Sequence, residues 1–249
     1  MPTLQVDFVS DVACPWCAVG LASFEQALKD VAKTITVELH FQPFELNPTM
    51  GAEGADAAQY LIAKYGMSRE QLAENRKRIA ARGAALGFTF GERKHVWNTF
   101  DAHRLLHWAG LQSPALRAQG WPQRDGAPKG NVGALAGPGG SQRSDLGGLS
   151  PQHALKQALL KAYHGEGRNP GAHDVLIELA VAAGLDGERA HAVLVGKEFS
   201  DEVREAERFW YEAGINAVPA VVINRRHLIS GGQPPEVFAQ ALRKIAAEG

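Results

Sequence analysis

The first forty residues carry two alternating hydrophobic patterns with a helical pattern between them. Apolar and polar residues alternate over residues 4–8 and again over residues 35–41, which is the period of two that predicts a β-strand. Apolar positions in residues 24–31 fall on one face at helical spacing. The pattern therefore predicts a βαβ unit, in which the crossover favours a parallel strand pair.

The end of the chain carries a different pattern. Residues 220–223 form a short apolar run rich in β-branched side chains, a polar turn follows, and residues 228–229 resume the run. Pro234 and Pro235 then mark the start of a helix. This ββα unit and the βαβ unit together predict a four-stranded mixed sheet, with everything between them inserted.

The middle of the chain is predicted to be helical. Helical spacing of apolar residues extends over five stretches, and none repeats another: residues 72–86, 98–107, 155–162, 175–180 and 203–210. We therefore expect an α/β chain in two parts. Residues 1–44 and 217–249 form a βαβ…ββα domain, and residues 45–216 form a helical insertion.

One segment of the insertion, residues 112–150, has no apolar period. It is rich in glycine and proline, as in Gly137-Pro138-Gly139-Gly140, and cannot bury enough surface to offset the entropy of ordering it. We expect a disordered surface loop. A lid over the active site and a segment that binds a partner are the alternatives.

Composition and charge indicate which kinds of partner and which location to expect. Of the 249 residues, 45% are hydrophobic and 21% charged, and the formal net charge is -1. No long run of one sign occurs, which gives no reason to expect nucleic acid or an anionic membrane as a partner. Neither a signal-peptide pattern nor an apolar run of about 18 to 20 residues is found. We expect a soluble, cytoplasmic protein.

The only two cysteines stand together as Cys14-Pro15-Trp16-Cys17, between the first strand and the first helix. A helix N-terminus favours a thiolate, the species that attacks disulfides. In a reducing compartment such a pair is redox-active or metal-binding more often than structural. A zinc site usually has four ligands. No other cysteine exists, and only His103 and His107, four residues apart, leave a mixed site open. A buried, inert pair is the third reading.

Five stretches along the chain resemble one known family in their order and spacing. They are Ser10–Cys17, Phe44–Pro48, Asn98–Leu105, Glu166–Asn169 and Gly214–Pro219. This combination resembles the DsbA-like branch of the thioredoxin superfamily and, more narrowly, its cytoplasmic FrnE-type oxidoreductases. The resemblance implies a thioredoxin-like fold with a large inserted helical domain. It covers nearly the whole chain apart from residues 112–150, a segment that the family's chains usually lack.

The resemblance also implies roles for the residues. Cys14 is expected to be the exposed nucleophile and Cys17 the buried resolving thiol. Pro219 is expected to be a cis proline that faces the pair and exposes the backbone of Val218 to substrate. Pro15 removes a backbone donor near the thiolate, and Trp16 offers an apolar rim.

A further part of the resemblance lies in the helical insertion. Asn98, Thr99 and His103 match a signature expected to face the cleft from the helical domain. Asn98 or Thr99 as a simple helix cap, and His103 as a buried or an exposed structural histidine, are the plain alternatives.

Three functions follow from these observations. The first is a thiol–disulfide oxidoreductase that oxidises, reduces or isomerises disulfides of proteins or small molecules. The second is a glutathione-dependent isomerase or transferase, of hydroxychromene or kappa type, acting on a small aromatic substrate. The third is a non-catalytic holdase. No tightly bound cofactor and no metal are expected, and glutathione is the candidate thiol co-substrate.

Overall fold

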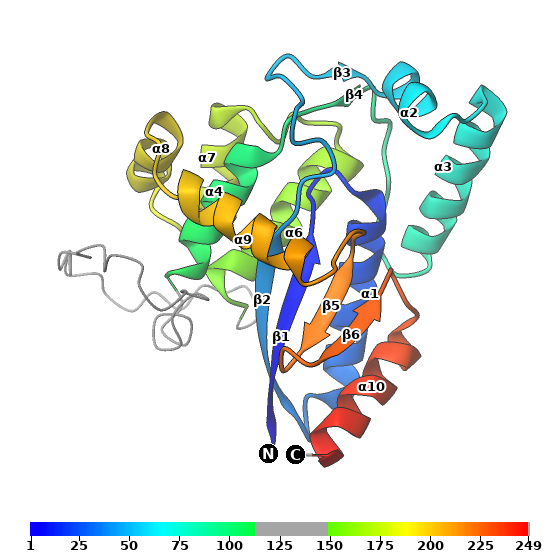
Figure 1. Ribbon diagram of the computed structural model, residues 1–249, viewed down its shortest axis with the longest axis vertical. Coiled ribbons are helices and arrows are strands. Elements are labelled where there is room, and N and C mark those ends of the chain that lie inside the picture. Colours follow the sequence, from blue (N-terminus) through cyan, green and yellow to red (C-terminus); the bar gives the residue numbers. More distant parts are fainter. Residues whose placement is uncertain (113–148, 249) are drawn as a thin grey trace.

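A four-stranded sheet made from both ends of the chain forms the base of the structure (Figure 1). The computed structural model describes residues 1–112 and 149–248. In sheet order, the strands are β2 (Thr36–Pro43), β1 (Thr3–Ser10), β5 (Ala220–Ile223) and β6 (His227–Ser230). β1 and β2 are parallel, while β5 is antiparallel to both β1 and β6. The mixed sheet predicted from the two ends of the chain is confirmed.

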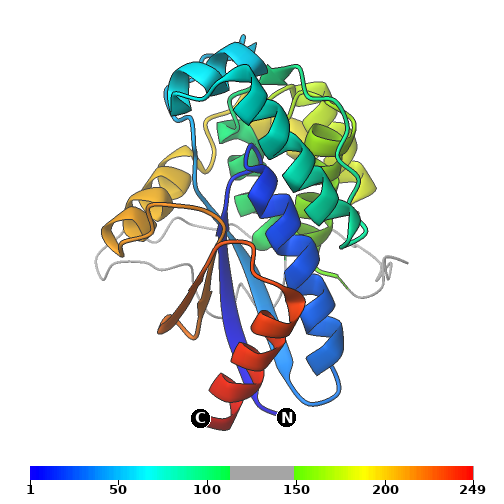
Figure 2. The same cartoon turned by 90° about the vertical axis from the view of Figure 1, so that its right-hand side faces the viewer.

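Two helices cover one face of this sheet. They are α1 (Pro15–Val31) and α10 (Pro235–Glu248), which lie side by side next to the two termini (Figures 1 and 2). Phe24 of α1 meets Phe238 of α10 edge to face, with ring centroids 5.2 Å apart, and both pack in one core with Phe8 of β1. Burying each of these rings contributes about 1.5–3 kcal/mol, so this core fixes α1 against the sheet.

Helix α9 (Ser200–Glu212) covers the opposite face (Figure 2). Trp210 packs there against Val9 and Val222. Its indole N–H donates to Gln42 Oε1 of β2 at 3.3 Å. Apolar residues therefore alternate between the two faces of β1, as the period of two requires.

The remaining elements form the helical region beyond the carboxyl ends of β1 and β2. They are β3 (Ala55–Asp56), α2 (Ala57–Tyr65), α3 (Arg69–Ala84), β4 (His95–Val96), α4 (Phe100–Gly110), α6 (Pro151–Leu160), the π-helix η1 (Lys161–Gly165), α7 (His173–Ala182) and α8 (Gly187–Val195). The five predicted helical stretches correspond to α3, α4, α6 with η1, α7 and α9. The short pair β3–β4, α2 and α8 were not predicted.

The side chain of Gln152 joins this helical region to the sheet. Its Oε1 accepts from Phe41 N at 3.1 Å, and its Nε2 donates to Phe41 O at 3.1 Å and to Leu106 O at 3.2 Å. Gln152 is 1% exposed, so these bonds exclude water. α4 and α6 are thereby held against the end of β2, beside the loop that carries the cysteines.

Three expectations from the sequence concern the loop at residues 112–150, membrane-spanning helices and the domain boundaries. The predicted loop at residues 112–150 lies, apart from its ends, outside the described residues. Across residues 1–112 and 149–248, none of the helices combines the length and the apolar character needed to cross a bilayer. The proposed domain boundaries at residues 45 and 217 stay a prediction.

Candidate active site

The two cysteines occupy the first turn of α1. Cys14 is the N-cap residue, and Pro15 follows at the first helical position, where a missing N–H is tolerated. The Cys17 N–H donates to Cys14 O at 3.0 Å, and both thiols are free. Cys14 is 5% exposed and Cys17 is 0% exposed. The expectation that Cys14 is exposed is therefore wrong, because Cys17 and the Val218 carbonyl lie against its sulfur.

The surroundings of the two thiols drive their acidities in opposite directions. The Cys17 thiol, as a hydrogen-bond donor, lowers the pKa of Cys14, and the backbone N–H groups of Cys17 and Trp16 lower it further against the effect of burial. Burial, followed by the proximity of Cys14, raises the pKa of Cys17 well above its usual value. Since the thiolate is the attacking species, Cys14 is the more reactive of the two thiols, and Cys17 stays protonated at neutral pH.

The loop before β5 faces Cys14 from the other side. The Cys14 thiol donates to Val218 O at 3.6 Å, and the Val218–Pro219 peptide bond is cis. α1 approaches this loop closely because it has a glycine at position 20. A Cβ built on Gly20 would lie 2.8 Å from Pro219 Cγ, a distance too short for ordinary packing. Gly20 thus sets the spacing between the cysteine helix and the proline.

A buried carboxylate three residues before Cys14 fixes the loop that leads into α1. Asp11 accepts from Ala13 N at 2.9 Å, from Leu46 N at 2.6 Å and from Thr99 Oγ1 at 2.9 Å. His103 Nε2 lies 3.4 Å from the same carboxylate. Burial raises the pKa of Asp11, but the proximity of His103 and the hydrogen bonds from the Leu46 and Ala13 N–H groups outweigh it, so the pKa is lowered. Asp11 is ionised at neutral pH.

The three signature residues of the helical region are not arranged as expected. Thr99 is 3% exposed and His103 is 2% exposed, and both contact Asp11 instead of facing an open cleft. Asn98 donates to Met50 O at 2.9 Å and accepts from the Phe100 N–H at 2.8 Å. The expectation of a cleft-facing, substrate-binding trio is thus corrected. Thr99 and His103 support the cysteine loop, and Asn98 accepts a hydrogen bond from the first residue of α4.

Two further side chains hold this loop by its carbonyl groups. His164 Nε2 hydrogen-bonds to Val12 O at 2.8 Å, and Arg93 Nη1 donates to Ala13 O at 3.1 Å. Sequence reasoning missed both residues, together with Asp11. Their only signal was position: Asp11 lies inside a matched stretch and His164 lies two residues before another, while Arg93 is in none.

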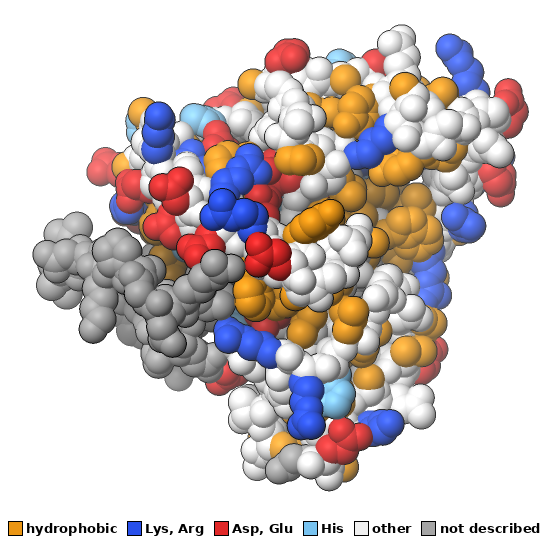
Figure 3. All heavy atoms as spheres, in the orientation of Figure 1, with side chains coloured by type: hydrophobic (Ala, Val, Ile, Leu, Met, Phe, Trp, Pro, Cys, Tyr) orange, Lys and Arg blue, Asp and Glu red, His pale blue; other side chains and the backbone are white. Residues whose placement is uncertain are grey.

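The rim of the site is partly apolar. Pro15 and Trp16 are partly exposed, and the Arg78 guanidinium lies 5.8 Å from the centre of the Trp16 ring. In the space-filling view, hydrophobic side chains gather between α9 and α3, near the N-terminal end of α1 (Figure 3). An extended apolar or aromatic group could therefore contact the protein beside the cysteines.

The described residues do not gather a metal site. No three histidine, cysteine, aspartate or glutamate side chains come together among them in a way that could hold a metal ion. His107 instead packs against Phe199, with ring centroids 5.2 Å apart, while His103 contacts Asp11. The two histidines considered for a mixed zinc site therefore make their main contacts with different residues.

A known family matches this chain over most of its length. The family described as "DSBA-like thioredoxin domain" matches residues 5–120 and 144–243. The chain belongs to this family. The thioredoxin-like fold with a helical insertion, inferred from the motifs, is thereby confirmed, as is the assignment to the DsbA family.

Three solved structures show how far the similarity extends. A probable DsbA oxidoreductase from Streptomyces coelicolor is 32% identical, with a TM-score of 0.77 over 99% of this chain and 91% of that one. A 2-hydroxychromene-2-carboxylate isomerase is 12% identical (TM-score 0.64, 98% and 97% covered). The cytosolic disulfide reductase DsbM from Pseudomonas aeruginosa, with GSH, is 16% identical (TM-score 0.57, 98% and 99% covered). The last two show a shared fold only.

Proposed function

We propose that this protein is a thiol–disulfide oxidoreductase that cycles between the dithiol and the disulfide of Cys14 and Cys17. The observation that carries the proposal is the opposed acidity of the two thiols. The pKa of Cys14 is lowered and that of Cys17 is raised, and both lie in one helical turn, where an intramolecular disulfide can close. Thiol–disulfide exchange needs one thiol that attacks the substrate and a second that stays protonated until it resolves the mixed disulfide.

The reaction proceeds in two exchanges. The Cys14 thiolate attacks one sulfur of a substrate disulfide, that S–S bond breaks, and the departing sulfur leaves as a thiolate. Cys17 then loses its proton and attacks Cys14, so that the Cys14–Cys17 bond forms, the bond between Cys14 and the substrate breaks, and the second substrate sulfur leaves as a thiolate. The cysteine pair loses two electrons and the substrate gains two. The reverse sequence oxidises a substrate dithiol.

The substrate is proposed to bind along Trp16 and the backbone of Val218. When Cys14 is a thiolate it no longer donates to Val218 O, which leaves that carbonyl free to accept an N–H from a substrate backbone. We take disulfide-containing proteins or small molecules as substrates and glutathione as the thiol co-substrate, in the cytoplasm. The DsbM structure was determined with GSH, which supports the choice of glutathione.

A glutathione-dependent isomerase is the second candidate, because a hydroxychromene carboxylate isomerase shares the fold with a TM-score of 0.64. The second thiol weighs against it, since an isomerase that uses the thiol of glutathione has no step for a buried Cys17 to perform. Conversion of an aromatic substrate that depends on glutathione and survives Cys17→Ser would favour the isomerase. Suppression of client aggregation by Cys14→Ser at the wild-type level would favour a holdase.

The deciding experiment is a redox titration of the cysteine pair in graded glutathione buffers, read by thiol trapping and mass. Wild type should form one intramolecular disulfide, Cys14→Ser should form none, and Cys17→Ser should accumulate a mixed disulfide with glutathione. A potential near that of thioredoxin, about -270 mV, would mark a reductase, and one well above about -220 mV would mark an oxidant or isomerase. A wild-type pair that closes at no glutathione ratio would refute the proposal.

A further inference from the structure

Two arginines of the helical region contact the chain on either side of Cys14. The guanidinium carbon of Arg78, in α3, lies 5.8 Å from the centre of the Trp16 ring, and Trp16 comes two residues after Cys14. Arg93 lies between α3 and β4, and its Nη1 donates to Ala13 O at 3.1 Å. Ala13 directly precedes Cys14. The two cations therefore stand at the rim of the candidate active site.

Neither arginine is paired with an acid in the described part of the chain. Arg78 is exposed and, besides the Trp16 ring, contacts Asn75, to whose Oδ1 it donates at 3.2 Å. Arg93 is half-buried, and its guanidinium carbon lies 5.1 Å from the centre of the Tyr163 ring. A guanidinium group presents five N–H donors in a fixed fork that matches a carboxylate. The contacts named here use only some of them.

The remaining charges of α3 add to that of Arg78. This helix packs beside α1 (Figure 2). Its sequence holds five basic residues and two acidic ones: Arg69, Arg76, Lys77, Arg78 and Arg82 against Glu70 and Glu74. In the space-filling view, basic side chains border the hydrophobic side chains that gather between α9 and α3 (Figure 3). An anion that approaches the cysteines along α3 therefore meets positive charge next to an apolar surface.

A third cation of this region is already in use. Lys64 of α2 donates from Nζ to Leu46 O and to Asn47 Oδ1, both at 2.6 Å. These bonds hold the end of α2 on the segment that follows β2. Arg78 and Arg93 are thus the basic groups whose contacts with the cysteine motif leave donors for a ligand.

The centre of the site carries the opposite charge. Asp11 is 0% exposed and ionised, and its oxygens are held by three donors. Cys14 attacks as a thiolate. Both negative charges repel an anionic substrate, and the repulsion weakens as the distance grows. The arginines lie at the rim, where substrate is proposed to bind along Trp16, so they act on its charge at shorter range than the buried Asp11 does.

We propose that Arg78 and Arg93 bind a carboxylate that the substrate carries beside its disulfide, so that the protein prefers anionic disulfides to neutral ones. The proposal rests on the oxidoreductase function above and names the substrate class for it. The Trp16 ring holds the Arg78 guanidinium in place by a cation–π contact, which reduces the entropy lost when the side chain binds a ligand. The Cys14 thiolate then attacks the nearer sulfur, the substrate S–S bond breaks, and the other half leaves as a thiolate.

Two aromatic disulfides that differ in charge test this preference. Dithionitrobenzoate carries a carboxylate on each half, whereas 4,4′-dithiodipyridine is uncharged at neutral pH. Attack by Cys14 on either one releases a light-absorbing product, at a rate proportional to the reagent concentration. Stopped-flow absorbance of the reduced protein gives the two rate constants, and the readout is their ratio, anionic over neutral. A change in the acidity or burial of Cys14 affects both reagents and cancels in this ratio.

The arginine variants should lower the ratio. Arg78→Gln should lower it about threefold, within the range for one exposed charge pair. Arg78→Glu should lower it about tenfold, because a repulsion replaces the attraction. Arg93→Gln should lower it about threefold, and here the ratio alone is informative because the bond to Ala13 O is also lost. Raising the ionic strength from about 0.15 M to about 1 M, which shortens the Debye length from about 8 Å to about 3 Å, should reduce the wild-type ratio.

The matched control is Arg76→Gln. Arg76 is exposed on the same helix, and its loss changes the net charge by the same amount. Residues two apart on a helix do not face the same side, so Arg76 does not share the position of Arg78 over Trp16. At about 0.15 M salt this control should change the ratio by less than about 1.5-fold.

The other outcomes overturn the proposal in distinct ways. An unchanged ratio in Arg78→Glu would show that Arg78 does not contact the substrate. Equal slowing with both reagents would mean that Arg78 acts on Cys14 and not on substrate charge. A loss in Arg76→Gln as large as in Arg78→Gln would indicate the net charge of the protein. All these results use the first release, by Cys14. If wild type showed no second, concentration-independent release by Cys17, the oxidoreductase function would fail instead.

Discussion

Replacing Asp11 by asparagine should destabilise the protein and at the same time make Cys14 more acidic. The carboxylate accepts hydrogen bonds from Ala13 N, Leu46 N and Thr99 Oγ1 at 2.6–2.9 Å. An asparagine can keep the two bonds to one oxygen, but its NH₂ group would then face the Leu46 N–H. Losing one charge-assisted bond costs about 1.5–3 kcal/mol, and the buried, unpaired donor adds about 1–3 kcal/mol.

The expected loss is therefore about 2.5–6 kcal/mol of unfolding free energy, from the sum of these two costs. The pH dependence has a defined sign. Because the folded pKa of Asp11 is lowered, its contribution is fully present above the unfolded pKa of about 3.9 and is lost as the pH falls through the folded pKa. The variant should lack this acid-induced loss. Removing the charge should also lower the pKa of Cys14, which Asp11 raises.

Urea unfolding of the reduced protein, followed by tryptophan fluorescence, measures the stability, and the pH dependence of Cys14 alkylation measures the acidity. Asp56→Asn is the matched control. Asp56 caps α2 by accepting from Gln59 N at 2.8 Å in an exposed position, where asparagine caps equally well. Wild-type stability in Asp11→Asn, or a higher pKa of Cys14, would refute the reasoning.

Three further predictions concern the same site and its support. Gly20→Ala should lose about 1–3 kcal/mol by overpacking against Pro219, measured by thermal unfolding, although alanine is otherwise the better helix former. Since burial lowers the pKa of His107 to about 4, stability should fall as the pH drops from about 6.5 towards that value, by up to about 1.4 kcal/mol per pH unit. His107→Leu should flatten this slope in urea titrations. Iodoacetamide at neutral pH should label Cys14 and spare Cys17 until the chain is unfolded, as read by mass; equal labelling would contradict their opposed acidities.

The sheet was predictable because its strands show either an alternation of apolar and polar residues or a short apolar run. The alternation over residues 4–8 became β1, and the apolar run at 220–223 became β5. By contrast, α2 was not predicted: it has only nine residues, and Ala57 is its only buried one. The short helix α8 begins at Gly187, a poor helix former.

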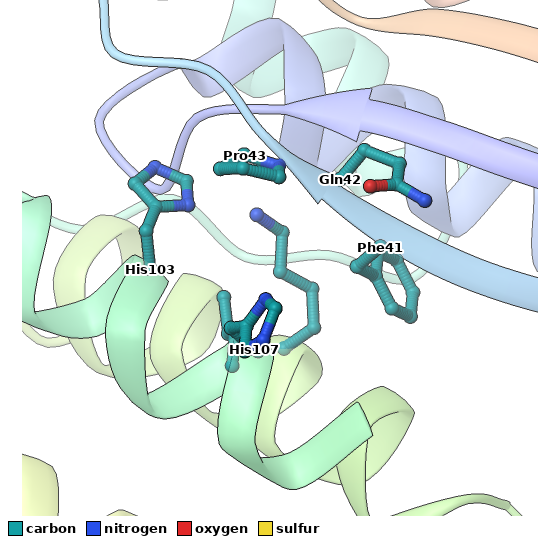
Figure 4. A pocket seen from close by; sticks show the side chains of 7 residues that line it. Phe41, Gln42, Pro43, His103 and His107 are labelled. Atoms are coloured by element: carbon teal, nitrogen blue, oxygen red, sulfur yellow. The ribbon is translucent and has the colours of Figure 1, made fainter. Parts of the chain in front are cut away.

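The site was predictable only where chemistry is local. A Cys-x-x-Cys motif lies within four consecutive residues, so the sequence alone predicts its redox chemistry. The hydrogen-bond donors to Asp11 come instead from residues 13, 46 and 99. No pattern along the chain shows that these segments meet. Lys156 of α6, which lines a small pocket with Phe41 and His103 (Figure 4), is a similar case. A lysine in a helix is normally solvated, and only the packing of α4 and β2 around it reveals its burial.

These contacts make the helical region a part of the candidate active site. Thr99, His164 and Arg93 all come from the inserted residues, and they hold Asp11 and the carbonyls of Val12 and Ala13. A sheet with α1 and α10 alone would leave that carboxylate and those carbonyls without these partners. The loop would then be free to turn its polar groups to water, and Cys17 would lose the burial that raises its pKa. The difference in acidity between the Cys14 and Cys17 thiols is therefore a property of both parts of the chain together.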